Sequence, residues 1–84
     1  MRYTVNLGRS VEKELQRLPA EVLKRICQKL VELEGDPRPS DIKKLRGVDG
    51  YRLRVEDYRV LFTIRDKSKE VCVYGVKHRK EVYK

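Results

Sequence analysis

Polar and apolar side chains alternate along residues 51–56. Arg52 and Arg54 fall on one side of this alternation, and Leu53 and Val55 fall on the other. Because successive side chains of a strand point to opposite faces of a sheet, the pattern predicts a strand with one buried and one solvated face. Both guanidinium groups would project from the solvated face, and such planar, permanently charged groups are suited to binding phosphate. The segment therefore predicts a surface for a polyanion.

The first third of the chain predicts a strand followed by a helical hairpin. Residues 2–7 alternate in the same way and are expected to form a half-buried strand. Ser10 is the expected N-cap of a first helix, which ends before Pro19 because proline suits the first turn of a new helix. Gly35 is expected just beyond the end of the second helix. The broad apolar face of this helix comprises Val22, Leu23, Ile26, Cys27, Leu30 and Leu33.

The rest of the chain predicts a small antiparallel sheet. Residues 36–50 are polar and interrupted by prolines, so they are expected to form a connection anchored to the core by Ile42 and Leu45. The last seven residues are expected to form a short helix or an ordered tail. The fold class is therefore α+β, in the order β-α-α-β-β-β, with the helical hairpin packed on one face of a mostly antiparallel sheet. Strands joined by short links are expected at about residues 51–56, 58–66 and 70–77.

The face of the sheet without helices would remain open, and Arg52, Arg54 and Arg59 could converge there. A bulge near residues 57–58 would send Arg59 to the other side. The pattern also allows simpler interpretations. Arg52 and Arg54 can be an ordinary solvated strand face, and Arg59 can be the ion-pair partner of Asp57.

Length and charge limit the class of protein and its partners. Residues 1–84 are expected to form a single domain with a thin core. The net charge is +8, and it is uneven, because residues 1–37 hold seven Lys/Arg against six Asp/Glu whereas residues 38–84 hold fourteen against seven. This asymmetry favours a nucleic acid or an acidic protein as partner. A membrane is not an expected partner, since no basic amphipathic helix with bulky apolar anchors is present.

Two cysteines and the absence of targeting segments add further expectations. Cys27 and Cys72 lack metal-type spacing and are expected to be small buried apolar residues. Neither a metal nor a small-molecule cofactor is expected. With no signal peptide and no apolar run of membrane length, the protein is expected to be cytoplasmic.

Short motifs follow one another along the chain in a specific order and spacing. They are Leu18-Pro19, Asp36-Pro37-Arg38, Lys44-Leu45-Arg46-Gly47, Tyr51-Arg52-Leu53-Arg54-Val55, Asp57-Tyr58-Arg59-Val60 and the terminal His78-Arg79 with Glu81-Val82-Tyr83. Together they resemble the RelE/ParE toxin superfamily over essentially the whole chain. The resemblance implies a microbial ribonuclease-like fold and a toxin of a type II toxin–antitoxin system, held inactive by a cognate antitoxin that wraps it.

The superfamily contains two kinds of toxin. RelE-type members cut mRNA in the ribosomal A site and so inhibit translation, whereas ParE-type members poison DNA gyrase without RNA chemistry. The basic residues that end in His78-Arg79 and Tyr83 favour the RelE type, with mRNA as substrate and the ribosome and its RNA as partners. A third possibility is a basic nucleic-acid-binding module that has lost toxic activity.

The resemblance also implies roles for particular residues. Arg52 and Arg54 match basic residues, often lysines, that face the scissile phosphate, and Arg59, Arg79 and Tyr83 match further catalytic positions. The shorter tail leaves the match of Arg79 open by a residue or two. The RNA-binding residues are expected to be Lys43, Lys44, Arg46, Lys77, His78 and Lys80, of which the first three could instead contact an acidic antitoxin segment or only solvate a loop.

Metal-free cleavage of RNA uses the 2′-OH as nucleophile on the adjacent phosphate. The chemistry requires a base for the 2′-OH, positive charge for the phosphorane and an acid for the leaving 5′-oxygen. Arginines suit the second task, but an arginine is a poor base because its pKa lies above about 12. Tyr83, His78 and Glu56 remain as candidate bases, of which Glu56 is equally an ion-pair partner and His78 an ordinary surface residue. We therefore expect modest acid–base catalysis, with the ribosome orienting the mRNA.

Overall fold

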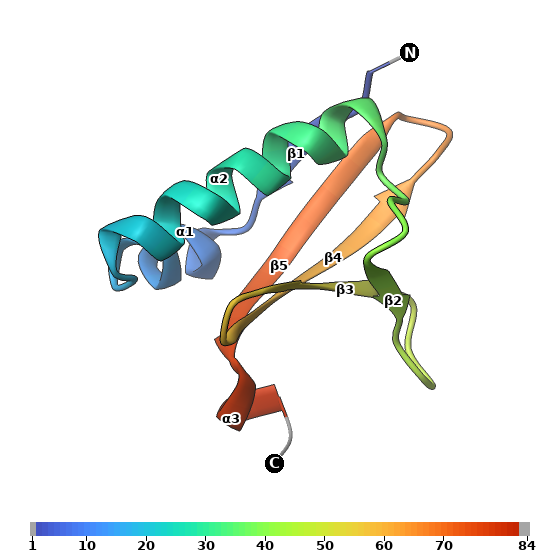
Figure 1. Cartoon of the computed structure of the whole chain (residues 1–84). Helices are drawn as coiled ribbons and strands as arrows, with labels where there is room; N and C mark the ends of the chain where they lie inside the picture. The colour runs from blue at the N-terminus through green and yellow to red at the C-terminus, as the bar shows by residue number, and fades with distance from the viewer. Residues whose placement is uncertain (1, 83–84) are drawn as a thin grey trace.

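The structure is a computed structural model that describes residues 2–82. Two helices, α1 (Arg9–Gln16) and α2 (Ala20–Gly35), cover one face of a sheet, as Figure 1 shows. We call this covered side the inner face and the opposite side the outer face. Among the described residues the sheet has the strand order β1-β5-β4-β3-β2. Its strands are β1 (Thr4–Leu7), β2 (Ile42–Lys44), β3 (Tyr51–Val55), β4 (Tyr58–Arg65) and β5 (Glu70–His78), and the short helix α3 (Arg79–Val82) follows β5.

Strand pairing confirms the predicted α+β fold with a mostly antiparallel sheet. β1 runs parallel to β5, whereas the pairs β5–β4, β4–β3 and β3–β2 are antiparallel. The three predicted strands after residue 50 agree with the structure to within one residue at each end. Of the two alternatives expected after β5, a short helix or an ordered tail, the structure has the helix α3.

The prediction of an irregular connection over residues 36–50 was wrong in one respect, because β2 lies within it. Ile42 pairs with Leu53 and Lys43 pairs with Arg52. Two of the three residues of β2 are lysines, so the sequence shows no apolar alternation there, and the strand depends on its pairing with β3. Ile42 packs against the core as predicted, and Leu45 is half-buried.

The helix ends also differ from the prediction. The first helix begins at Arg9 with Gly8 in the N-cap position, and no side chain caps it, so Ser10 is not the cap. The amide of Gly8 donates to the carbonyl of Val73 at 3.0 Å, which shows that β1 pairing continues to the first turn of the helix. Gly35 belongs to α2, and Asp36, in an extended conformation, is its C-cap.

Apolar side chains of both helices and of the inner face form the core. In α2 the buried residues are Val22, Ile26, Leu30 and Leu33, at the three- and four-residue spacing of one helical stripe. Cys27 is exposed, so its predicted burial was wrong. It is one residue, or about 100° of helical rotation, from Ile26 and therefore leaves the stripe. Cys72 is half-buried.

A β-bulge in β5 separates two stretches of inner-face residues. Leu61 of β4 pairs with Gly75, whereas the next residue, Phe62, pairs with Val73, so Tyr74 is the extra residue. Val73 and Val76 are both buried, at 2% and 4% exposure. Without an extra residue, positions 73 and 76 would lie on opposite faces, so the bulge keeps both valines in the core.

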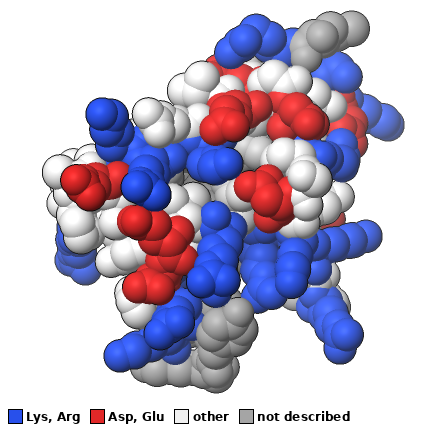
Figure 2. All heavy atoms as spheres, in the orientation of Figure 1, with Lys and Arg blue, Asp and Glu red and all other residues white. Residues whose placement is uncertain are grey.

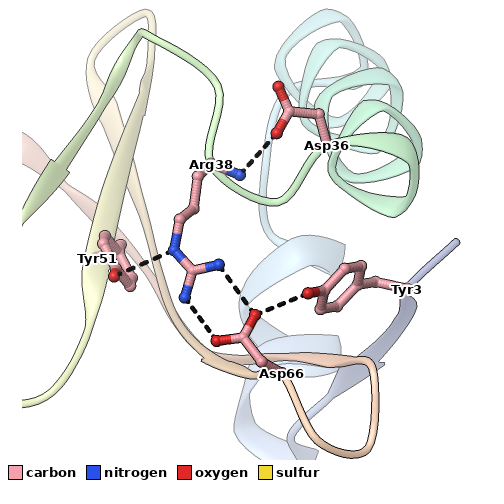
Figure 3. Close-up of polar contacts among 5 residues, drawn as sticks. All are labelled: Tyr3, Asp36, Arg38, Tyr51 and Asp66. Atoms are coloured by element: carbon pink, nitrogen blue, oxygen red, sulfur yellow. Dashed lines mark hydrogen bonds and ion pairs between the residues drawn. The ribbon is translucent and has the colours of Figure 1, made fainter. Parts of the chain in front are cut away.

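A polar network ties together parts of the chain that are distant in sequence. Figure 3 shows the guanidinium of Arg38 bound to both carboxylate oxygens of Asp66, at 3.0 and 2.9 Å. The hydroxyl of Tyr3 donates to Asp66 at 2.7 Å, and Nε of Arg38 donates to the hydroxyl of Tyr51 at 3.5 Å. The network therefore connects the residue before β1, the segment after α2, the start of β3 and the β4–β5 turn.

This network predicts a pH dependence of stability. Hydrogen bonds from Arg38 and then from Tyr3 hold the pKa of Asp66 well below its usual value. A carboxyl whose pKa is lower in the folded state stabilises the fold above its unfolded pKa of about 3.9, and this contribution is lost as the pH falls below that value. Because both partners are about half exposed, solvent screening keeps the effect modest.

We expect Asp66→Asn to unfold at a lower temperature than the wild type at pH 7, with a difference that shrinks towards pH 3. Thermal unfolding followed by circular dichroism between pH 3 and pH 7 measures this. Asp49→Asn, which changes an exposed carboxylate in the loop before β3, is the matched control and should follow the wild type. A difference between Asp66→Asn and the wild type that stays constant with pH would contradict the role of the ion pair.

Candidate functional site

Basic side chains from β2, β3 and β4 converge on the outer face. The β3–β4 register places Arg54 directly opposite Arg59, and the β2–β3 register places Lys43 opposite Arg52. Side chains of directly paired residues project from the same face. These residues line a depression of about 490 Å³. We call it the arginine depression; its described lining residues are Lys43, Arg52, Arg54 and Arg59 together with Asp41 and Glu56.

The turn between β3 and β4 determines from which face of the sheet Arg59 projects. Val55 pairs with Tyr58, so the turn consists of Glu56 and Asp57, and no bulge interrupts the register. Glu56 has a φ of 54°, a left-handed conformation that is uncommon outside glycine. Its carbonyl accepts a hydrogen bond from Nε of Arg54 at 3.2 Å. The turn thus places Arg54 and Arg59 on the same face and also orients one of the two guanidinium groups.

Arg59 is the most deeply placed basic residue of the depression. It is only 5% exposed, and its Nη1 donates to the carbonyl of Tyr58 at 3.2 Å. Burial of a charged group is costly unless hydrogen bonds compensate for the lost water. The side chain is therefore held in place before any ligand arrives, and its charge acts from a position with little competing solvent.

Two carboxylates at the depression limit the local excess of positive charge. Glu56 forms an ion pair with Arg25 of α2 at 3.6 Å, which fits its interpretation as an ion-pair partner. Asp41 lies 3.4 Å from Nζ of Lys29. Asp41 was not among the predicted site residues, because its position at the depression depends on β2, a strand that the residue pattern does not predict.

Arg79 and Lys77 lie next to the depression, outside the residues that line it. The amide of Arg79 donates to the carbonyl of Asp57 at 2.7 Å, and its Nε lies 3.9 Å from the carboxylate of Asp57. Lys77 pairs with Arg59 in the sheet register, and its ammonium forms an ion pair with Glu14 of α1. Both basic residues are thus held beside the Arg54–Arg59 end of the depression.

The other predicted site residues are more dispersed. His78 pairs with Tyr58, the residue before Arg59, so His78 lies on the inner face whereas Arg59 lies on the outer face. The ring centroids of His78 and Tyr58 are 5.2 Å apart in an edge-to-face arrangement. Nδ1 of His78 accepts a hydrogen bond from the amide of Lys80 at 3.3 Å. Lys44 and Arg46 are exposed outside the depression, and Tyr83 lies outside the described residues.

The charge distribution agrees with this geometry. In Figure 2, Lys and Arg cover much of the lower part of the view, below the two helices, whereas Asp and Glu lie mainly in its middle and upper parts. An open depression with several fixed cations can bind phosphate groups and stabilise additional negative charge that develops on them. Among the described residues, no helix is long and apolar enough to cross a bilayer.

Comparisons with known proteins identify the family. Residues 5–83 match the model of the ParE toxin of the type II toxin–antitoxin system parDE. The RelE1 protein of Methanocaldococcus jannaschii is 30% identical, over 100% of this chain and 98% of its own length.

Solved structures agree with this assignment. The archaeal RelE–RelB complex of Pyrococcus horikoshii contains a chain with 35% identity and a TM-score of 0.85, covering 94% of this chain and 97% of that one. A free mutant of E. coli toxin RelE gives 31% identity and a TM-score of 0.81, with coverages of 99% and 92%. The chain therefore belongs to the RelE/ParE superfamily of toxins from type II toxin–antitoxin systems.

Proposed function

We propose that this toxin is a metal-independent, ribosome-dependent endoribonuclease that cleaves mRNA in the A site and thereby inhibits translation. The observation that carries the proposal is the arginine depression, in which Arg52, Arg54 and the buried Arg59 face one open surface. The likeness to RelE structures over almost the whole chain supports the same function.

In this proposal the arginines act on the scissile phosphate. Attack by the 2′-OH creates a phosphorane with one more negative charge than the ground-state phosphodiester. Arg59 stabilises this charge from its fixed, buried position, and Arg52 and Arg54 bind the phosphate from the more open part of the depression. Arg79 approaches from the side, next to Asp57. Lys43 and the more distant Lys44, Arg46, Lys77, His78 and Lys80 contact the remaining RNA or ribosomal RNA.

Acid–base catalysis has a smaller share in this mechanism. The ring of His78 lies on the inner side and packs against Tyr58, so it is poorly placed to reach a 2′-OH over the arginine depression. Glu56 lines the depression but pairs with Arg25. Tyr83 keeps the proposed role of orienting the nucleotide or accepting its proton. The ribosome supplies the in-line geometry, which can contribute several orders of magnitude in rate.

The proposed partner in the resting state is a cognate antitoxin. Similar chains, with 35% and 27% identity, occur in the RelE–RelB complex of Pyrococcus horikoshii and in the toxin–antitoxin complex RelBE2 of Mycobacterium tuberculosis. An antitoxin segment with acidic residues would be attracted to the arginine depression, where it would exclude RNA.

We expect Arg59→Ala to reduce A-site cleavage by about 10²–10³-fold, the typical loss when one fixed donor to a developing charge is removed. Primer extension on 70S ribosomes programmed with a short mRNA measures the cuts. Arg65→Ala is the matched control, since Arg65 lies on the same strand and faces the same side but is exposed and pairs with Glu70 at the far end. It should cleave as the wild type does.

Because Arg59 is buried, its removal can also change stability, so an exposed variant is needed beside it. Arg54→Ala removes a side chain that is exposed at the opposite register position. It should cleave at least tenfold more slowly while melting at the wild-type temperature. Full cleavage by both variants would exclude the arginine depression as the catalytic site.

The second candidate function is inhibition of DNA gyrase, which the ParE description of the matching family model favours. We expect the purified toxin to leave supercoiling by gyrase unaffected at concentrations that cleave A-site mRNA completely. A supercoiling assay with relaxed plasmid tests this, with Arg79→Ala/Tyr83→Ala as the comparison. Inhibition of gyrase by the wild type and this double variant alike, with intact mRNA on ribosomes, would establish the ParE-type activity.

A further inference from the structure

We propose that Tyr74 forms an aromatic platform on the outer face, on which a base of single-stranded RNA stacks while a neighbouring phosphate occupies the arginine depression. The inference rests on the proposed RNA-directed function and specifies how the substrate is held. It concerns a residue that lies outside the depression and outside the motifs from which the site residues were assigned.

The bulge is what presents Tyr74 to solvent. Tyr74 and Gly75 together face Leu61 across the β4–β5 pair, and both flanking valines, Val73 and Val76, are buried in the core. Tyr74 therefore projects from the outer face, where it is 45% exposed. A single half-exposed aromatic side chain is common on a protein surface, so a binding role for Tyr74 has to follow from its orientation and its neighbours.

The side chain of Tyr74 lies along the sheet and does not stand upright on it. A Cβ atom placed on Gly50, just before β3, would lie 3.1 Å from the hydroxyl oxygen of Tyr74 and 3.3 Å from the carbonyl oxygen of Phe62. The phenol thus extends from β5 over β4 towards the beginning of β3. Strand side chains normally stand perpendicular to the sheet, which would leave the hydroxyl far from Gly50.

Gly50 makes this arrangement possible. It is buried, and its φ of 156° is a conformation that side chains rarely allow. The absence of a side chain leaves room for the hydroxyl of Tyr74 at the edge of β3. Burial also raises the pKa of this hydroxyl above its usual value.

The platform is close to the arginine depression. Arg52 pairs with Leu61, and Leu61 pairs with Gly75, the neighbour of Tyr74. At about 4.8 Å between adjacent strands, Arg52 and Gly75 are separated by roughly 10 Å across the sheet. The tyrosine hydroxyl lies beside Gly50, two residues or about 7 Å along the strand from Arg52. A base on Tyr74 and a phosphate at Arg52 can therefore belong to the same or adjacent nucleotides.

The charge around Tyr74 favours nucleic acid as the occupant. An aromatic ring beside a row of cations is the usual arrangement in proteins that bind single-stranded nucleic acid, because the cations follow the phosphates and the ring accepts any base. An apolar anchor of a protein partner would instead require an apolar surrounding surface. Here the outer-face neighbours of Tyr74 on β4 are Leu61 and Thr63, and the nearest position on β3 is Arg52, opposite Leu61. The apolar surface beside the ring is therefore small and is bordered by the arginine depression.

The test measures binding of the full-length toxin to a fluorescent 2′-O-methyl oligonucleotide, which cannot be cleaved because its 2′ oxygen is blocked. We expect Tyr74→Ala to weaken binding about 5- to 150-fold, the equivalent of one lost base–aromatic stack. Tyr74→Phe keeps the ring and should bind as the wild type does. Tyr74→Leu retains apolar cover over β4 and should be as weak as Tyr74→Ala, at an unchanged melting temperature.

Two further readouts separate stacking from charge. The dependence of affinity on salt should have the same slope in the wild type and Tyr74→Ala, whereas Arg52→Ala should lower the slope by about one unit, as expected for one lost phosphate contact. A second set of oligonucleotides carries one abasic residue, placed at each position in turn. At one of these positions the abasic oligonucleotide should bind the wild type as weakly as the intact oligonucleotide binds Tyr74→Ala. That abasic residue should weaken Tyr74→Ala no further.

Equal binding of intact and abasic oligonucleotides by the wild type, or wild-type affinity in Tyr74→Ala, would overturn the platform. Either result with ribosomal cleavage intact would leave the proposed nuclease function standing, whereas absence of cleavage by the wild type on programmed ribosomes would reject that function independently. If Tyr74→Ala lost affinity for the co-expressed antitoxin but kept its affinity for RNA, Tyr74 would be a protein anchor, and the platform would be rejected.

Discussion

The register between β3 and β4 is the constraint on which the site depends. It places Arg54 directly opposite Arg59, although like charges at directly paired positions are unfavourable. The apolar residues of the other face compensate for this, because Leu53, Val55, Val60 and Phe62 are all buried against the helices. A slip of one residue would move these side chains into solvent and the arginines into the core, so the hydrophobic face fixes the position of the charges. The site thus derives its rigidity from the core beneath it.

Carboxylates surround this concentration of positive charge. Asp41 and Glu56 border the arginine depression, Asp57 contacts Arg79, and Glu14 pairs with Lys77. These carboxylates partly neutralise the cluster and leave its open side basic. A polyanion bound there would relieve the remaining repulsion and therefore stabilise the fold as well as occupy the site. An acidic antitoxin segment would act in the same way, so under the proposed function the antitoxin and RNA would compete for this surface.

Regular alternation made most of the sheet predictable, and interruptions of alternation account for what was missed. β3 and β4 followed from their patterns, and so did the common face of Arg52 and Arg54 once the strand was assumed. β2 was not predicted because Ile42-Lys43-Lys44 shows no alternation of apolar and polar residues. Without β2, the position of Asp41 at the depression could not be predicted either. The exposure of Cys27 follows from the exact rotation of α2, which sequence spacing resolves only for the centre of an apolar stripe. The bulge at Tyr74 was equally hidden, since the run Val71–Val76 reads as a continuous strand.

The bulge in β5 affects both the packing of the core and the side chains on the outer face. An uninterrupted strand would keep alternation from Val73 onward, and Val76 would then face outward while Lys77 pointed into the core. The extra residue restores Val76 to the core and Lys77 to the outer face beside Arg59. The same irregularity leaves one side chain more on the outer face than alternation allows, and that side chain is the aromatic ring of Tyr74, two strands away from Arg52. The bulge is therefore required for packing of the core, and it also places Tyr74 on the outer face, where the side chain can contact a ligand without removing a residue from the core.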